Sequence, residues 1–138
     1  MTSADLIEHL NRFREPFLDD LGCEILAVDP EAMDCHMKFE IPKRFCHSGD
    51  VVQGGFVAAM LDAVSTHALF AANTKINVVA TLELKVSYLE VSRMGEFQAM
   101  GKVLKLTRSV AFLEAELRDP NGLLRATMTA TAKIRVSE

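Results

Sequence analysis

The stretch GGFVAAMLDAVSTHALFAA, residues 54–72, decides the fold of this chain. It starts with a glycine pair, is rich in alanine and is apolar almost all round a helical wheel, so its length and composition favour a helix over a strand. A helix that is apolar on every side must be buried, either in a protein core or in a membrane. The longest unbroken apolar runs, residues 56–61 and 68–72, are far shorter than the about 20 residues of a membrane span. We therefore expect a buried core helix and no membrane partner.

The residues before this helix predict a short N-terminal helix and a β-hairpin. Residues 3–14 place Leu6, Leu10 and Phe13 on one helical face, with Thr2 or Ser3 as the N-cap. Pro16 ends that helix or starts a second short turn. After Gly22 the apolar period changes to two, which indicates strands over 23–28 and 34–40 that pair across the turn at 29–31.

The residues after the central helix are strand-like throughout. Apolar and polar residues alternate over 82–88, and further runs follow at 95–106, 109–118 and 124–136, with a tight-turn signal at 119–122. We expect these four strands in meander order. The predicted fold is α+β: an antiparallel sheet of about six strands wrapped around one long central helix, with a short N-terminal helix. One helix cannot cover both faces of such a sheet, so self-association is expected.

Composition limits the classes of function. The 138 residues suit a single domain over 1–138, and 49% hydrophobic content excludes disorder. A net charge of −4 offers no field for nucleic acid, and the first fifteen residues lack the features of a signal peptide, so we expect a cytoplasmic location. Three cysteines without a paired spacing predict neither disulfides nor a metal site. A thiol nucleophile at Cys46 is disfavoured, because the adjacent His47 would seldom lie in line with it.

The segment HSGDVVQGGFVAAMLDAVST, residues 47–66, carries the chemistry. Glycines at a helix start let a ligand approach main-chain N–H groups that have no helical partner and lie at the positive end of the dipole. These groups would stabilise an oxyanion; the plain alternative is glycine for tight packing. Asp62 is the only acid between Asp50 and Glu83 and lies among apolar neighbours. Its carboxylate is therefore either functional or has a plain structural explanation: it is held by Ser65, Thr66 or His67, or it emerges at a groove.

These residues match a known pattern. Gln53-Gly54-Gly55 followed by Asp62, the run TLELKVSYLE, a glycine at 95 and the closing strands resemble the hotdog-fold acyl-CoA thioesterases, most closely the subgroup related to the phenylacetate-pathway thioesterase. The resemblance covers nearly the whole chain. That subgroup usually shows an Asn, a short loop, His-Gly-Gly, and an Asp or Glu nine positions after the His. Here the His is replaced by Gln53 and the loop Asn by His47.

The resemblance implies hydrolysis of an acyl-CoA thioester to free acid and CoA at the interface of two chains. The Gly54 N–H polarises the carbonyl, while Asp62 of the partner chain acts as general base or nucleophile. Thr81 matches the hydroxyl that orients water, and Gln53 and His47 complete the expected catalytic set. We expect substrate contacts from Gly55, Ser65, Thr66, Arg108 and Ser109. A homodimer that pairs into a dimer of dimers is expected, with no cofactor and no metal, since CoA is part of the substrate.

Two other functions stay open. A hotdog hydratase or dehydratase would need a catalytic His with a carboxylate, but Asp62 and His67 lie five positions apart and the signature Asp-x-Asn-Pro-x-His is absent. A non-catalytic acyl-CoA binding module would use the same groove. Such modules usually add a DNA-binding segment, and the sequence has no helix-turn-helix pattern or basic arm.

Overall fold

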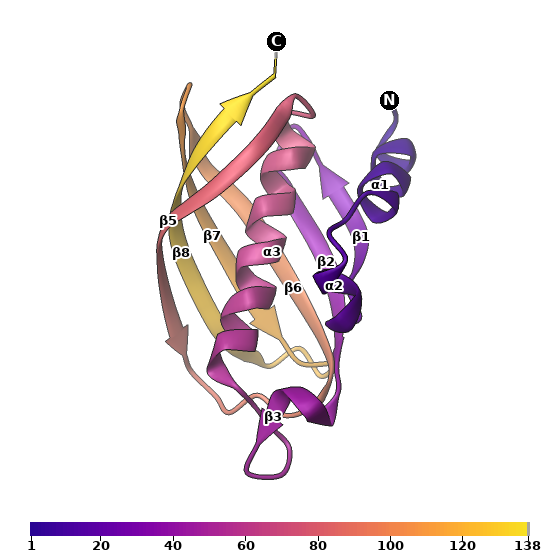
Figure 1. Cartoon of the computed structure of the whole chain (residues 1–138), viewed down its shortest axis with the longest axis vertical. Coiled ribbons are helices and arrows are strands. Elements are labelled where there is room, and N and C mark those ends of the chain that lie inside the picture. The colour runs from indigo at the N-terminus through magenta and orange to yellow at the C-terminus, as the bar shows by residue number, and fades with distance from the viewer. Residues whose placement is uncertain (138) are drawn as a thin grey trace.

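Helix α3 (Gly54–Ala72) is the centre of the fold, and a curved sheet wraps round it in the computed structural model, which describes residues 1–137 (Figure 1). Met60, Leu61 and Val64 on this helix are completely buried. By length and composition alone α3 qualifies as a membrane span, yet 56% of that stretch is buried inside the protein. Its cover by the sheet, rather than the shortness of its apolar runs, is what identifies it as a core helix.

The sheet has six antiparallel strands in the order β1-β2-β6-β7-β8-β5. The α+β fold predicted from the sequence is confirmed, but the meander is wrong in one strand: β5 pairs with β8 and not with β6. The reason is that β6 is already paired along its length with β2 on one side and β7 on the other. Without β5 the sheet has two edges, β1 and β8; β5 pairs with β8 and extends the sheet round the far side of α3. The strand bounds are β1 (Glu24–Asp29), β2 (Asp34–Ile41), β5 (Ile76–Tyr88), β6 (Gly95–Leu106), β7 (Val110–Arg118) and β8 (Leu124–Val136).

Small side chains on the inner face of the sheet bring α3 unusually close to β6. A Cβ added at Gly101 would lie 2.5 Å from the Val64 carbonyl oxygen and 2.7 Å from the Ser65 nitrogen. The helix main chain therefore rests directly on the strand at this point. The neighbouring inner positions on β7 and β8 are filled largely by alanine, and these residues are buried: Ala111, Ala115, Ala126, Ala130 and Ala132.

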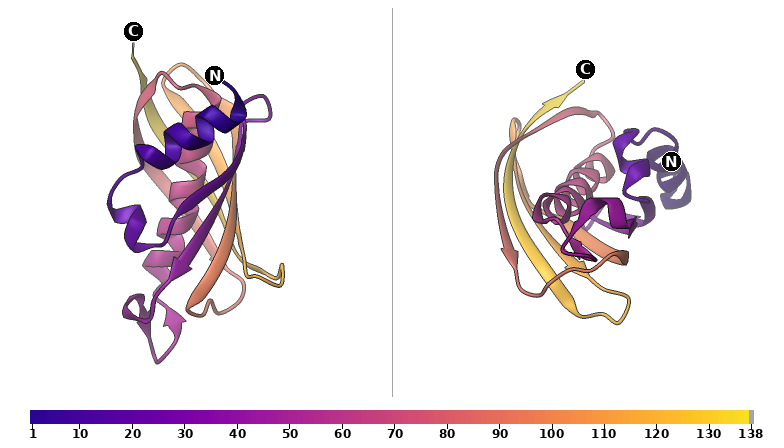
Figure 2. Two further views of the ribbon diagram at one scale, coloured as in Figure 1. Left: turned by 90° about the vertical axis from the view of Figure 1, so that its right-hand side faces the viewer. Right: turned by 60° about the horizontal axis from the view of Figure 1, so that its bottom comes forward.

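Two short helices cover the open side of the sheet. Helix α1 (Ser3–Arg12) begins with a capping box in which the Thr2 hydroxyl accepts from the Asp5 N–H and the Asp5 carboxylate accepts from the Thr2 N–H. Helix α2 (Phe17–Asp20) follows Pro16. Figure 2 shows both beside β1 and α3. The Asn11 amide bonds to the main chain of Ile25 through both its oxygen and its nitrogen, which ties α1 to the edge of β1.

A small substructure precedes α3. It consists of the 3₁₀ turn η1 (Lys43–Phe45) and the two-residue strands β3 (Cys46–His47) and β4 (Val51–Val52). The Phe45 ring packs on Phe56 with centroids 4.4 Å apart, and the Gln53 N–H donates to the Phe45 carbonyl oxygen. These contacts fix the direction in which the chain enters α3.

Candidate active site

A carboxylate and a hydroxyl meet halfway along α3. The Thr81 hydroxyl of β5 donates to the Asp62 carboxylate over 3.0 Å. The local partners considered for Asp62 do not hold its carboxylate: the Ser65 hydroxyl donates to the Asp62 main-chain oxygen, and the His67 Nδ1 pairs with the Ala63 carbonyl oxygen at 2.7 Å. The carboxylate is half-buried, with one oxygen held by Thr81. It is therefore oriented and still reachable.

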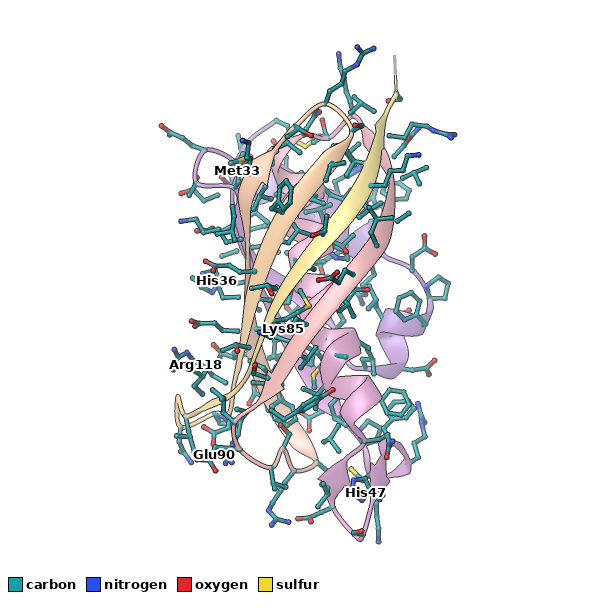
Figure 3. The ribbon with its side chains drawn as sticks, turned by 90° about the vertical axis from the view of Figure 1, so that its left-hand side faces the viewer. Met33, His36, His47, Lys85, Glu90 and Arg118 are labelled. Carbon is teal, nitrogen blue, oxygen red and sulfur yellow. The ribbon has the colours of Figure 1, made fainter. Side chains whose placement is uncertain are left out.

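An irregularity in β5 aims Thr81 at Asp62. Thr81 is opposite Ala132 and Glu83 is opposite Thr131, so Leu82 is an extra residue between two neighbouring pairs. Such a bulge reverses the side on which following residues point. Thr81 therefore faces the helix, Leu82 is 61% exposed, and Lys85 projects from the outer face of the sheet (Figure 3). A regular alternation through Leu82 would have turned Thr81 outward.

The Asp62–Thr81 pair lies on the wall of a groove with a volume of about 560 Å³ between α1, α2, α3 and the start of β5. Three phenylalanines line it: Phe13, Phe17 and Phe70. His67 also lines it, and burial lowers the pKa of this imidazole below its ordinary value, so the ring is neutral near pH 7. The groove thus combines a mainly apolar lining with one oriented carboxylate.

The start of α3 forms a second polar group of atoms. Gln53 is the N-cap residue, and within residues 1–137 no side chain caps the helix there. The Gln53 carbonyl oxygen accepts from the N–H groups of Phe56 and Val57, which leaves the first two N–H groups, those of Gly54 and Gly55, without a helical acceptor. The Tyr88 hydroxyl donates to the Gly54 carbonyl oxygen over 2.8 Å.

Within one chain, the Asp62–Thr81 pair and the free N–H groups at the start of α3 lie far apart. Gly54 and Asp62 are eight residues apart on one helix, which corresponds to about 12 Å along its axis. His47 is exposed on the β3–β4 hairpin, at the end of the molecule where α3 begins (Figure 3). One substrate atom therefore cannot touch the Gly54 N–H and the Asp62 carboxylate of the same chain.

The other predicted substrate contacts are dispersed. Thr66 lines the same groove as Asp62. Ser65 is completely buried, and this position gives it no access to the groove, so its predicted substrate contact has no support here. Arg108 and Ser109 are exposed in the turn between β6 and β7, outside the residues that line the groove.

Sequence reasoning missed two parts of this site. Phe13 was expected on the buried face of the N-terminal helix, but α1 ends at Arg12 and the ring is 66% exposed at the groove. The sequence pattern places Tyr88, the only tyrosine in the chain, in a strand and gives it no further role. Phe13 belongs to no local motif, and Tyr88 lies in the run TLELKVSYLE without any role assigned to it there, because each residue reaches the site through tertiary packing.

Comparison with known proteins places the chain in a family. The family model of the thioesterase superfamily matches residues 49–126, which include Asp62, Thr81 and Tyr88. This protein belongs to the thioesterase superfamily. A candidate esterase of Saccharolobus solfataricus is 35% identical over 89 residues, and the match spans 63% of this chain and 63% of the length of that relative.

Solved structures of other proteins share nearly the whole fold of this chain. A phenylacetic acid degradation-related protein of Ralstonia eutropha, described as a candidate thioesterase, is 29% identical with a TM-score of 0.83, covering 93% of this chain and 98% of that one. The PaaI protein of E. coli, from the phenylacetic acid degradation operon, has a TM-score of 0.83 at 12% identity, with 97% and 94% coverage. At 12% identity, the similarity to the PaaI protein shows a shared fold and nothing more. The hotdog thioesterase fold predicted from the sequence is confirmed.

Proposed function

We propose that this protein hydrolyses an acyl-CoA thioester to a free acid and CoA. The observation that carries the proposal is the Asp62 carboxylate, held by Thr81 at the wall of a largely apolar groove in a chain of the thioesterase superfamily. An oriented, accessible carboxylate can act as the general base that activates water for thioester hydrolysis. The groove supplies a place for the acyl part.

The reaction follows from the two halves of the site. Asp62 accepts a proton from water, whose oxygen attacks the thioester carbon, and Thr81 keeps the carboxylate in place. The negative charge that develops on the carbonyl oxygen is stabilised by the Gly54 N–H at the start of a helix. The carbon–sulfur bond then breaks and the CoA thiolate takes up a proton. Direct attack by Asp62, with a mixed anhydride that water then cleaves, uses the same positions.

Two chains are needed for this arrangement. The about 12 Å between Gly54 and Asp62 on one helix is too far for one carbonyl group, so the Gly54 N–H of one chain must act with the partner subunit's Asp62. A symmetric dimer makes two such sites. In this proposal Gln53 and Gly55 lie beside the thioester, with His47 near the entrance. Arg108 and Ser109 remain proposed contacts for the CoA part.

A hydratase mechanism is less consistent with the structure. It needs an imidazole that exchanges a proton with substrate, but His67 is 6% exposed and its Nδ1 is bonded to the Ala63 carbonyl oxygen. A non-catalytic binding module is the other alternative. It would bind acyl-CoA equally well with or without the carboxylate and would release no thiol.

The test is release of free CoA thiol from short, medium, long and aryl acyl-CoA substrates. Asp62→Asn keeps the size of the side chain and should lower kcat by roughly 10²–10⁴, the usual contribution of a general base. Asp20→Asn is the matched control, since this exposed carboxylate contacts only Arg44 at the surface. Unchanged kcat in Asp62→Asn would contradict the mechanism, and a parent protein that cleaves no thioester would contradict the function.

Mixing two inactive variants tests the shared site. Gly54→Pro removes the N–H, and the Gln53 angles of φ −56° and ψ 133° allow a proline to follow, although the new Cβ would also lie 3.3 Å from the Tyr88 hydroxyl oxygen. After subunit exchange with Asp62→Asn, half of the dimers are mixed and each holds one intact site, so about a quarter of the parent activity should return. No recovery in mixed dimers that have been shown to form would place both groups in one chain.

A further inference from the structure

We propose that Tyr88 is a positioning residue that fixes the start of α3, and with it the main-chain donors that face the thioester oxygen. The inference rests on the proposed function for its catalytic consequence. Tyr88 lies at the end of β5, while Gly54 opens α3, so a strand and a helix start are joined by one side chain.

Two contacts connect the ring to Gly54. The hydroxyl donates to the Gly54 carbonyl oxygen over 2.8 Å. A Cβ added at Gly54 would lie 3.3 Å from the Tyr88 hydroxyl oxygen and 3.4 Å from the ring carbon that bears it. The ring therefore lies against the face of Gly54 where any other residue would have its side chain. Gly55 differs, because a Cβ there would meet nothing within 4 Å.

The helix start needs such a support. Two successive glycines are the least rigid residues with which a helix can begin, and no side chain caps this end within residues 1–137. The hydrogen bond from Tyr88 fixes the peptide plane between Gly54 and Gly55, and ring contact restricts the rotation of Gly54 itself. Both free N–H groups are thereby held in one direction. A preorganised donor stabilises a developing oxyanion better than one that must first be ordered.

The first test removes only the hydrogen bond. Tyr88→Phe keeps the ring and should lower kcat roughly fivefold while KM changes less than twofold, because the donors matter most when charge develops on the oxygen. Ser137→Ala is the matched control: its hydroxyl also donates to a carbonyl oxygen, that of Lys75, but it lies near the C-terminus. Equal kcat in the parent and Tyr88→Phe would overturn the proposal.

The second test uses the steric contact. Gly54→Ala should lower kcat in the parent, because the new methyl group would lie 3.3 Å from the Tyr88 hydroxyl oxygen and the hydroxyl must shift by a few tenths of an ångström. In a Tyr88→Ala background the ring is absent, so Gly54→Ala should cause no additional loss. Such non-additivity is expected of residues in direct contact. If the fold-loss of kcat in the double variant equals the product of the fold-losses in the two single variants, Tyr88 does not act through Gly54.

A third measurement does not depend on activity. Hydrogen exchange of the Phe56 and Val57 amides, both bonded to the Gln53 carbonyl oxygen, reports opening of the first turn of α3. Tyr88→Phe should speed their exchange roughly fivefold, with no change in the middle of the helix. A parent protein that cleaves no thioester would end the proposed function but leave this test intact. Unchanged exchange rates would overturn the positioning role in either case.

Discussion

Replacing Gly101 by alanine should destabilise the whole fold, because the central helix touches the sheet there. The new Cβ would lie 2.5 Å from the Val64 carbonyl oxygen, whereas ordinary contacts begin at 3.4 Å. The helix must withdraw by about 1 Å, a gap at which packed atoms lose up to half of their attraction. Overpacking of this kind costs about 3 kcal/mol, near the upper end of the usual range. The same withdrawal moves the turn of α3 that carries Asp62 away from Thr81.

Thermal unfolding followed by circular dichroism, at one fixed protein concentration, measures this effect. For a chain of 138 residues the expected cost lowers the Tm by roughly 10 °C. Gly55→Ala is the control for stability, since its added methyl group meets nothing and alanine is the better helix former. Equal Tm values for the two alanine variants would refute the argument that backbone contact at Gly101 sets the position of α3.

Two further predictions concern the N-terminal helix and the buried imidazole. Asn11→Ala removes both hydrogen bonds to the main chain of Ile25 and should lower the free energy of unfolding by about 1–2 kcal/mol, measured by urea unfolding. Equal urea midpoints for the parent and the variant would show that α1 docks without these two hydrogen bonds. For His67, burial lowers the folded-state pKa below its ordinary value of 6.5, so the unfolded chain binds the proton first and stability falls as the pH drops below about 6.5. His67→Gln should therefore lose less stability than the parent between about pH 7.5 and about pH 5.5, and equal losses would exclude this linkage.

Local patterns predicted α3 and the hairpin of β1 and β2, because each of these depends on the periodicity of its own residues. The start of β5 was predicted less well: the alternation indicates a strand from residue 82, whereas β5 begins at Ile76. The partner of β5 could not be predicted in the same way, since it depends on which sheet edge is free after β6 has paired with β2. The bulge at Leu82 could not be predicted for a similar reason, because Leu82, Leu84 and Val86 alternate regularly with polar residues in the sequence. Only the register against β8 shows that Leu82 is the extra residue.

The same dependence on pairing explains why the candidate site needed the structure. Asp62 and Gly54 attract attention in the sequence, because an acid in an apolar helix and a glycine pair are both unusual. Their supports are ordinary strand residues: Thr81 is expected at the site only through the family resemblance, and Tyr88 is not expected there at all. Both supports come from β5: its Thr81 hydroxyl bonds to the Asp62 carboxylate, and its Tyr88 hydroxyl bonds to the Gly54 carbonyl oxygen. Because one edge strand holds both halves of the site, a change that shifts β5 along β8 would misplace the proposed base and the proposed oxyanion donors together.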